Sequence, residues 1–188
     1  MATLSQSRIF TEEELMALPK DSGKWELVNG ELTLMAPAGF DHGDIIGTLF
    51  VLLGFHVRKN RLGRILDGQT GFWMKSGNLF SPDLSFVSRA RLAGLKRGST
   101  GFFKGSPDLA VEVLSPTESK AAANKKIREY FKNDTRLAWL IDPSKKSIFV
   151  HHSPVADAVL HIGDVLDGES IVPGFSMPAA DLFAEFDI

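Results

Sequence analysis

The sequence predicts a mixed α/β fold, in which helices flank a mixed β-sheet, within one domain of residues 1–188. Three observations lead to this prediction. Helical and strand patterns alternate along the chain in the order helix, strands, helix, strands, helix, strands. The segment "PDLAVEVLS", from Pro107, is apolar on both faces, as a strand in the centre of a sheet is. The length of 188 residues suits one domain with a sizeable core.

The composition is that of a soluble globular protein, with 44% apolar and 23% charged residues. The net charge of -2 gives no global basic signal for nucleic acid, although a local basic patch can be sufficient for binding. The sequence has no cysteine, which excludes disulfides, thiolate catalysis and zinc-thiolate sites. The N-terminus lacks a secretory pattern, and the longest apolar run, "IIGTLFVLLGFHV", is shorter than a bilayer span. We therefore expect a cytoplasmic protein with no membrane partner.

The first elements should be a short helix and a β-hairpin. In "TEEELMAL", Thr11 and Glu14 have the spacing of a capping box. In "KWELVNGELTLM", Asn29-Gly30 is the preferred two-residue hairpin turn, and it pairs Val28 with Glu31. This register predicts an apolar face that packs on the core and a partly polar second face. The apolar face holds Trp25, Leu27, Leu32 and Leu34, and the second face holds Glu26, Val28, Glu31 and Thr33.

The remaining elements follow from periodicity and turn signals. Residues 41 to about 60 have helical spacing of Ile45, Leu49, Leu52, Leu53 and His56. Strands are expected in "GRILDGQTGFWM", "LFSPDLSFVS" and "PDLAVEVLS". A helix follows in "TESKAAANKKIREYFKND", with Thr117 as its candidate N-cap. "RLAWLIDP" and "SIFVHHS" then form a strand pair with "PSKK" at the turn.

Two of the predicted strands carry carboxylates where a buried strand should be apolar. Alternate residues of a strand share a face, so Asp83 and Glu112 converge if their strands are neighbours. Burying an unpaired carboxylate costs several kcal/mol or shifts its pKa, and a metal ion would offset that cost. Glu26, on the polar face of the hairpin, is a third candidate. Carboxylates around one point favour a hard cation such as Mg²⁺ or Mn²⁺, which can activate a bound water for phosphate chemistry.

A lysine from the following helix would complete such a site by stabilising charge on an attacked phosphate. At about 100° per residue, the buried face of that helix is defined by Ala123, Ile127, Tyr130 and Phe131, and the Tyr130 hydroxyl is expected at the rim of the site. Lys126 lies at the edge of this face, whereas Lys125 points to solvent. Lys120 lies over the same face nearer the N-terminus. Lys126 is therefore the first choice, with Lys120 in reserve.

Taken together, these motifs resemble the PD-(D/E)XK nuclease superfamily and, more narrowly, the putative restriction endonuclease family called Uma-two. The resemblance rests on "WELVNGEL", "DHGDIIGTL", "SPDLSFVS", "PDLAVEVLSP", "KIREYF", "LAWLIDP", "PGFSM" and "ADLF", in the family's order along nearly the whole chain. It implies a restriction-endonuclease-like mixed sheet that uses Mg²⁺, or Mn²⁺, to hydrolyse DNA. It also implies that Asp83 and Glu112 are metal ligands and that Glu26 is a further catalytic acid.

The sequence departs from the family pattern at two positions. The superfamily's short motif would place a lysine two residues after Glu112, where this chain has Leu114. The family resembled here takes its lysine from the following helix, and Lys126 matches that position. The family commonly has an aspartate one turn before that lysine, where this chain has Ala122. This departure favours an alternative, in which a catalytically weakened nuclease fold acts as a nucleic-acid-binding or scaffold module.

Several other residues have competing interpretations. We interpret Asp108 as a turn or strand-entry residue, and His42 as either a helix cap or a neighbour of the metal site. A basic, Gly-rich connection offers phosphate contacts through Arg89, Arg91, Lys96 and Arg97. The resemblance implies DNA as the partner, while the residues themselves fit DNA and RNA alike. A homodimer is compatible with this activity, because two copies related by a two-fold axis can cut both strands of a duplex.

Overall fold

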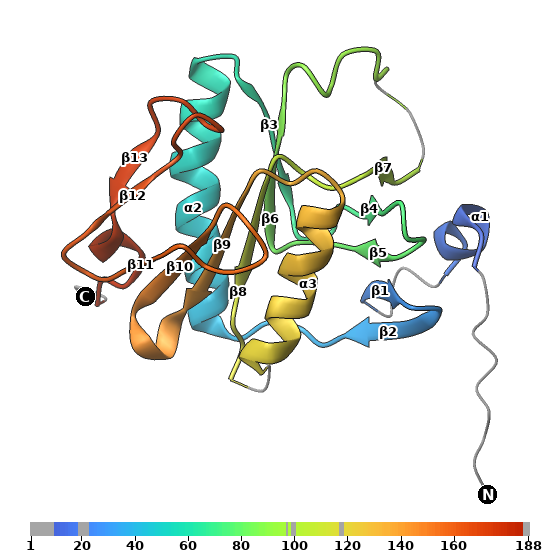
Figure 1. Ribbon diagram of the computed structural model, residues 1–188, viewed down its shortest axis with the longest axis horizontal. Coiled ribbons are helices and arrows are strands. Elements are labelled where there is room, and N and C mark those ends of the chain that lie inside the picture. Colours follow the sequence, from blue (N-terminus) through green and yellow to red (C-terminus); the bar gives the residue numbers. More distant parts are fainter. Residues whose placement is uncertain (1–9, 19–22, 97, 99–100, 117–118, 186–188) are drawn as a thin grey trace, which may run out of the picture.

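A six-stranded mixed sheet is the centre of the computed structural model, which describes residues 10–18, 23–96, 98, 101–116 and 119–185 (Figure 1). Its strands, in spatial order, are β11 (Ala158–Leu160), β10 (Ser147–His151), β9 (Leu137–Asp142), β8 (Leu109–Val113), β6 (Leu84–Ser88) and β3 (Gly63–Asp67). β8 and β9 are parallel, and the other neighbours are antiparallel. All five residues of β8 are buried, which confirms its predicted central position.

Two helices cover opposite faces of this sheet. α2 (Phe40–Lys59) packs Ile45, Leu49 and Leu53 into the same apolar cluster as Val111. α3 (Lys120–Lys132) packs Ile127 on the other face, with Ala110. Because alternate strand residues share a face, Glu112 lies on the Ala110 side, towards α3. The carboxylate of the central strand therefore faces the helix that carries the candidate lysines.

α2 differs from its predicted packing in one respect. Val57 completes the buried face, whereas Leu52, which was expected there, is 40% exposed. Leu52 lies about 100° from Val51 on the helix, which places it on the flank of the helix. By its length and mean hydropathy, α2 is long and apolar enough to cross a membrane. The shorter run "IIGTLFVLLGFHV" within it did not suggest this. Four of its residues are nevertheless buried in this fold.

The N-terminal hairpin belongs to a second, five-stranded sheet beside the first. Its order is β2 (Glu31–Met35), β1 (Lys24–Val28), β5 (Leu79–Phe80), β4 (Phe72–Trp73) and β7 (Phe103–Lys104). The predicted register of the hairpin is confirmed, with Val28 opposite Glu31. The capping box of α1 (Glu12–Met16) is also present. The segment "LFSPDLSFVS" is two strands rather than one, since Ser81–Asp83 passes from the second sheet to the first.

The predicted faces of the hairpin are partly wrong. Leu34 is 44% exposed because β2 is an edge strand of its sheet, while Glu26, on the face expected to be partly polar, is 2% exposed. Glu26 can be buried because its carboxylate accepts a hydrogen bond from the Ser81 backbone N–H at 3.3 Å and lies beside Lys126. On this face Glu26 is therefore turned into the protein, while Glu31 and Thr33 are exposed.

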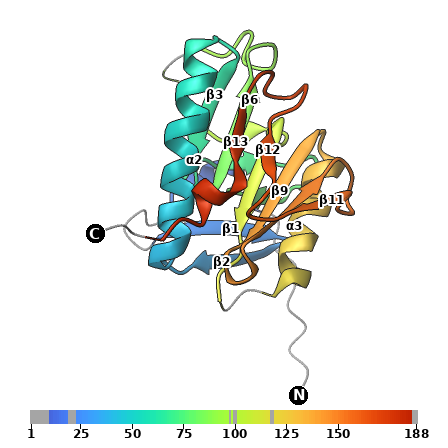
Figure 2. The ribbon, with the colours of Figure 1, turned by 90° about the vertical axis from the view of Figure 1, so that its left-hand side faces the viewer.

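The C-terminal segment packs against the α2 side of the sheet (Figure 2). It contains β12 (Val165–Asp167), β13 (Ser176–Pro178) and the 3₁₀ turn η3 (Ala179–Leu182). A second 3₁₀ turn, η2 (Pro143–Lys145), joins β9 to β10 at the predicted "PSKK" turn. Thr117 lies outside the described residues, and Ser119 is the N-cap of α3, accepting a hydrogen bond from the Ala122 N–H.

Candidate functional site

The register of β6 and β8 brings the two predicted metal ligands together. Leu84 pairs with Val111 and Ser85 with Ala110 in antiparallel order, so the next position along places Asp83 opposite Glu112. The Val113 backbone N–H donates to the Asp83 carboxylate at 2.9 Å, which ties Asp83 to the end of β8. The two strands are neighbours, as the convergence of the two side chains requires.

Two basic side chains, His42 and Lys24, lie beside Asp83. His42 Nε2 lies 3.0 Å from Asp83 Oδ2, and Lys24 Nζ lies 3.7 Å from Asp83 Oδ1. Burial acts to raise the pKa of Asp83, but the His42 hydrogen bond and the charges of Lys24 and His42 outweigh burial and leave the pKa below its usual value. Asp83 is therefore ionised at neutral pH. The hydrogen bond to Asp83 in turn raises the pKa of His42.

These contacts decide the interpretation of His42 and add a residue that sequence reasoning missed. Gly39 is the N-cap of α2 and makes no side-chain cap, while the His42 side chain reaches the site. Lys24 also donates to the Ser81 carbonyl at 2.8 Å, so it is held at the crossing between the two sheets. A lysine at the start of a hairpin carries no local signal of this role.

Glu112 occupies a more enclosed position than Asp83. The Tyr130 hydroxyl donates to Glu112 Oε1 at 2.5 Å, and Lys126 Nζ lies 3.7 Å from Glu112 Oε2. Burial raises the pKa of Glu112 to about 7, because the charged form loses hydration, and the Lys126 charge only partly opposes this. Burial and the neighbouring Glu112 raise the pKa of Tyr130 well above its usual value, so its hydroxyl remains a donor.

Lys126 connects two of the candidate carboxylates. Its Nζ lies 3.1 Å from Glu26 Oε2 as well as 3.7 Å from Glu112, and its side chain is 12% exposed. Lys125 is exposed, as the helical spacing predicted. Lys120 Nζ lies 3.3 Å from the ring centroid of Phe149 on β10, so the reserve lysine makes a cation–π contact there. Lys126 is the helix lysine that the structure brings to the carboxylates.

The donor set fits a hard divalent cation that keeps part of its water. Among the described residues, no group of three or more His, Asp or Glu side chains could hold a metal ion. Mg²⁺ is usually bound by one or two carboxylates, with waters and substrate oxygens as its other ligands. Asp83 and Glu112, on facing strand positions, offer that number of carboxylates.

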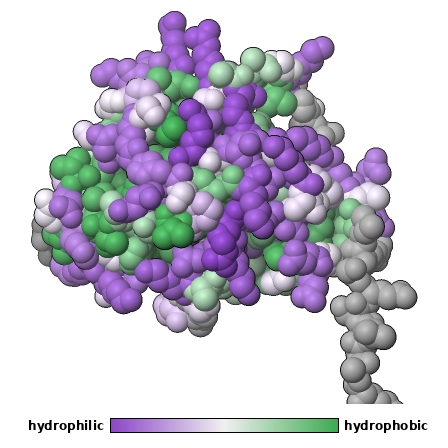
Figure 3. All heavy atoms as spheres, in the orientation of Figure 1, coloured by the Kyte–Doolittle hydropathy of each residue, from purple (hydrophilic) through white to green (hydrophobic). Residues whose placement is uncertain are grey.

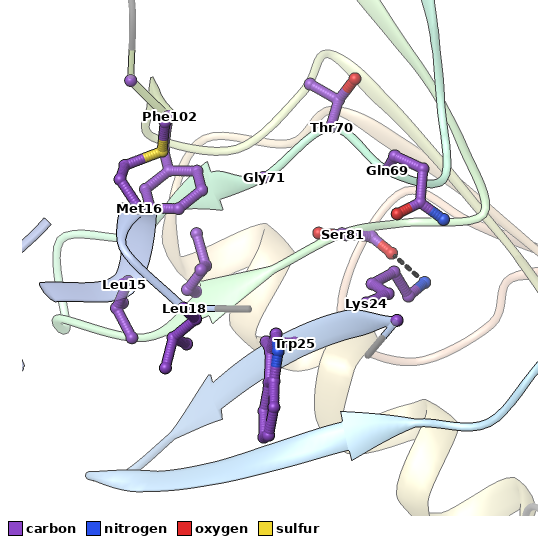
Figure 4. Close-up of a pocket in the computed structure, with 13 residues that line it drawn as sticks. Leu15, Met16, Leu18, Lys24, Trp25, Gln69, Thr70, Gly71, Ser81 and Phe102 are labelled. Carbon is purple, nitrogen blue, oxygen red and sulfur yellow. Dashed lines mark hydrogen bonds between the residues drawn. The ribbon is translucent and has the colours of Figure 1, made fainter. Parts of the chain in front are cut away.

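A cavity of about 410 Å³ adjoins the site (Figure 4). Leu15, Met16, Trp25 and Phe102 form part of its apolar wall, and Lys24, Gln69 and Ser81 line it as well. Figure 4 shows the hydrogen bond between Lys24 and the Ser81 carbonyl at the edge of the cavity. Lys24 lines this cavity and also contacts Asp83. The Lys24 side chain would therefore lie between a ligand in the cavity and the Asp83 carboxylate.

The basic connection lies at the opposite end of β6 from Asp83. Arg89 follows Asp83 by six positions along the strand, which corresponds to about 20 Å. Arg89 and Lys96 are exposed, whereas Arg91 lies over the Phe103 ring and 4.0 Å from Asp108. Arg97 lies outside the described residues. Arg91 thus has a packing role, and nearness in sequence to Asp83 did not indicate nearness in space.

Asp108 has the structural role that we assigned to it. Its carboxylate accepts from the Ser88 backbone N–H at 2.7 Å and from Arg136 Nη2 at 2.9 Å, and its side chain is 3% exposed. These bonds join the start of β8 to the end of β6 and to the residue before β9.

We expect Asp108→Ala to lower the free energy of unfolding by about 2 kcal/mol, because the half-buried Ser88 N–H loses its acceptor. Urea denaturation followed by circular dichroism measures this change. The matched control is Asp134→Asn, which weakens an exposed ion pair with Lys75, keeps a residue type suited to the positive φ of 77° at this position, and should change little. Equal stability of the two variants would contradict the role assigned to Asp108.

Comparison with known proteins agrees with this architecture. The model of the family described as putative restriction endonuclease, Uma2, matches residues 12–180. The chain therefore belongs to this family, as the sequence motifs indicated. It is also similar to a solved structure described as a putative nuclease belonging to DUF820 from Anabaena variabilis ATCC 29413. The TM-score is 0.81 at 23% identity, over 93% of this chain and 97% of that chain, which confirms the predicted fold class. No curated protein matches this chain.

Proposed function

We propose that this protein is a Mg²⁺-dependent endonuclease that hydrolyses DNA phosphodiester bonds, with Mn²⁺ able to replace Mg²⁺. The observation that carries the proposal is the β6–β8 register, which sets Asp83 opposite Glu112 with Lys126 beside Glu112. Membership of a family described as putative restriction endonuclease supports a nucleic acid substrate. The neighbour described as a putative nuclease shares the fold.

Asp83 and Glu112 would hold the cation, which when bound lowers the pKa of a water and stabilises charge on the phosphate. Asp83 is suited to this role because His42 and Lys24 keep its carboxylate ionised. Glu112 holds a proton more readily, so it must lose that proton before it can ligate. Cation binding and substrate cleavage should therefore strengthen as the pH rises through about 7.

Lys126 would act on the phosphate rather than on the cation. Glu26 holds its ammonium at 3.1 Å, which fixes the position of the charge beside Glu112. A positioned ammonium stabilises the negative charge that grows on the phosphate oxygens in the transition state. Glu26 is then a positioning residue for Lys126, and it also anchors the Ser81 N–H next to Asp83.

One observation favours the alternative of a nuclease fold that binds nucleic acid without cutting it. Each of the three carboxylates already has a lysine beside it, Lys24 for Asp83 and Lys126 for both Glu26 and Glu112, so part of their charge is compensated without a metal ion. Ala122, where the family commonly has aspartate, agrees with this alternative. A cleavage assay separates the two functions.

We expect the protein to cut double-stranded DNA in the presence of Mg²⁺, and Asp83→Asn to lower the rate about hundredfold or more. The reason is that the amide supplies no negative charge to a hard cation, whose contribution to catalysis is several kcal/mol. Product formation is measured on labelled DNA and, in parallel, on RNA of the same sequence. The matched control is Asp134→Asn, an exposed aspartate that pairs with Lys75 and should leave the rate unchanged.

Calorimetry tests the same proposed ligands through cation binding, without a measurement of cleavage. The parent should bind Mg²⁺ or Mn²⁺, and the Asp83→Ala, Glu112→Ala double variant should not. If the folded parent binds no divalent cation and cuts neither nucleic acid, the non-cutting alternative replaces the endonuclease. If the double variant binds the cation as well as the parent does, the ligands lie elsewhere.

A further inference from the structure

The outer face of α2 is apolar and exposed. Phe40, Val51 and Phe55 have exposed fractions of 74%, 66% and 67%, and Phe50 is 42% exposed on the flank. This face is opposite to the one that packs Ile45, Leu49, Leu53 and Val57 on the sheet. By contrast, hydrophilic side chains dominate the exposed surface over α3 (Figure 3). A run of exposed aromatic and aliphatic side chains on one helix is typical of an interaction surface.

Three glycines lie along the same helix at positions where no close contact within the chain requires a glycine. A Cβ built at Gly43, Gly47 or Gly54 meets nothing within 4 Å. Glycine in a helix interior is less stable than alanine, so these positions carry a cost that packing within the chain does not explain. Phe40, Asp44, Gly47, Val51, Gly54 and Arg58 follow one another at alternating spacings of four and three residues. This is the spacing of a seam along which a second helix packs closely.

The charges on this face are arranged for an antiparallel copy of the same helix. Asp41 and Asp44 are exposed at the N-terminal end, and Arg58 and Lys59 are exposed at the C-terminal end. We propose that two copies of this chain form a symmetric dimer through antiparallel α2 helices, with the two-fold axis near Val51. In this register Arg58 of each copy lies beside Asp44 of the other, and Phe55 lies over Gly47 of the other. The face is self-complementary in both charge and shape, as a two-fold interface requires.

This arrangement leaves the candidate site open. His42 lies about 180° around α2 from Val51, and it faces Asp83. The dimer therefore does not depend on the proposed nuclease activity. A membrane surface fits the face less well, because amphipathic helices at membranes are flanked by basic residues, whereas one end here is acidic.

The first test is the molar mass of the full chain, measured by light scattering after gel filtration over a range of concentrations. The parent should be a dimer, and Val51→Glu and Phe55→Glu should each raise the dimer dissociation constant by at least about tenfold. Val155→Glu is the matched control, since Val155 is 73% exposed but lies outside α2. Gly47→Leu should also weaken the dimer while leaving the fold intact, because Gly47 is exposed and a Cβ built there meets nothing of its own chain within 4 Å.

The second test determines whether the partner that binds the outer face of α2 is another copy of this chain. Asp44→Arg should weaken the dimer, and adding Arg58→Asp to that variant should restore it, because the exchanged charges again face each other. A monomeric parent, or a parent dimer that Val51→Glu, Phe55→Glu and Gly47→Leu all leave unchanged, would overturn the proposal. So would a monomer that sediments with vesicles of phosphatidylcholine and phosphatidylserine, which would assign the face to a membrane. Cleavage rates are not used in either test, so failure of the dimer and failure of the nuclease function are distinguishable.

Discussion

Replacing Lys126 by alanine should slow DNA cleavage about hundredfold while changing substrate binding much less. The Lys126 ammonium lies beside Glu26 and Glu112, where a phosphate held by the proposed cation would approach it. An interaction that strengthens only as charge develops in the transition state lowers the barrier without tightening ground-state binding. Single-turnover cleavage at saturating Mg²⁺ measures the rate, and fluorescence anisotropy in Ca²⁺ measures binding.

Two other lysines of α3 are the matched controls. Lys125→Ala removes an exposed side chain of the same helix and should cut at the parent rate. Lys120→Ala loses a contact with the Phe149 ring and should affect stability rather than cleavage. Circular dichroism checks that all three variants are folded. If Lys126→Ala cuts as fast as the parent, the helix lysine has no catalytic role, and if Lys120→Ala alone is inactive, the reserve lysine was the right choice.

The parts of the site that sequence reasoning found are those with a local signal. Asp83 and Glu112 are charged residues in segments that otherwise have the pattern of buried strands, and period-two alternation determines which neighbours share their faces. Lys126 follows from the same kind of reasoning, because the buried positions of one helix define its orientation. The hairpin register follows from its two-residue turn. In each case the deciding contacts lie within a few residues along the chain.

The parts that it missed depend on contacts between distant segments. Lys24 reaches Asp83 only because the hairpin joins a sheet through β5, and that pairing leaves no pattern near Lys24. The sequence left two roles open for His42, and the contact between His42 and Asp83 in the folded protein decides between them. The Arg89 region stays a prediction as a nucleic-acid contact, and the structure shows only that β6 carries it to the opposite end of the strand from Asp83. Tertiary packing, which local propensity does not contain, decided each of these positions.

Replacing Glu112 by glutamine should make the protein more stable at neutral and alkaline pH. The pKa of Glu112 is raised from 4.5 to about 7 in the folded protein, because burial disfavours its charge. Between these two values the folded state holds a proton that the unfolded state has released, so the stability of the parent falls as the pH rises through this range. Above about pH 7 the free energy of unfolding of the parent is lower by the full amount, which is about 3 kcal/mol. A glutamine keeps an acceptor for the Tyr130 hydroxyl but does not ionise, so the variant avoids this loss.

Urea denaturation without metal, from pH 5 to pH 8, measures the expected pattern. The free energy of unfolding of Glu112→Gln minus that of the parent should be small near pH 5 and should grow to about 3 kcal/mol above pH 7. Glu185→Gln, which changes an exposed carboxylate, should show no such trend. Added Mg²⁺ should stabilise the parent at pH 8 but not the Glu112 variant, because only the parent keeps both proposed ligands. A stability difference that stays flat with pH would mean that Glu112 titrates normally, and the raised pKa would then have no part in cation binding.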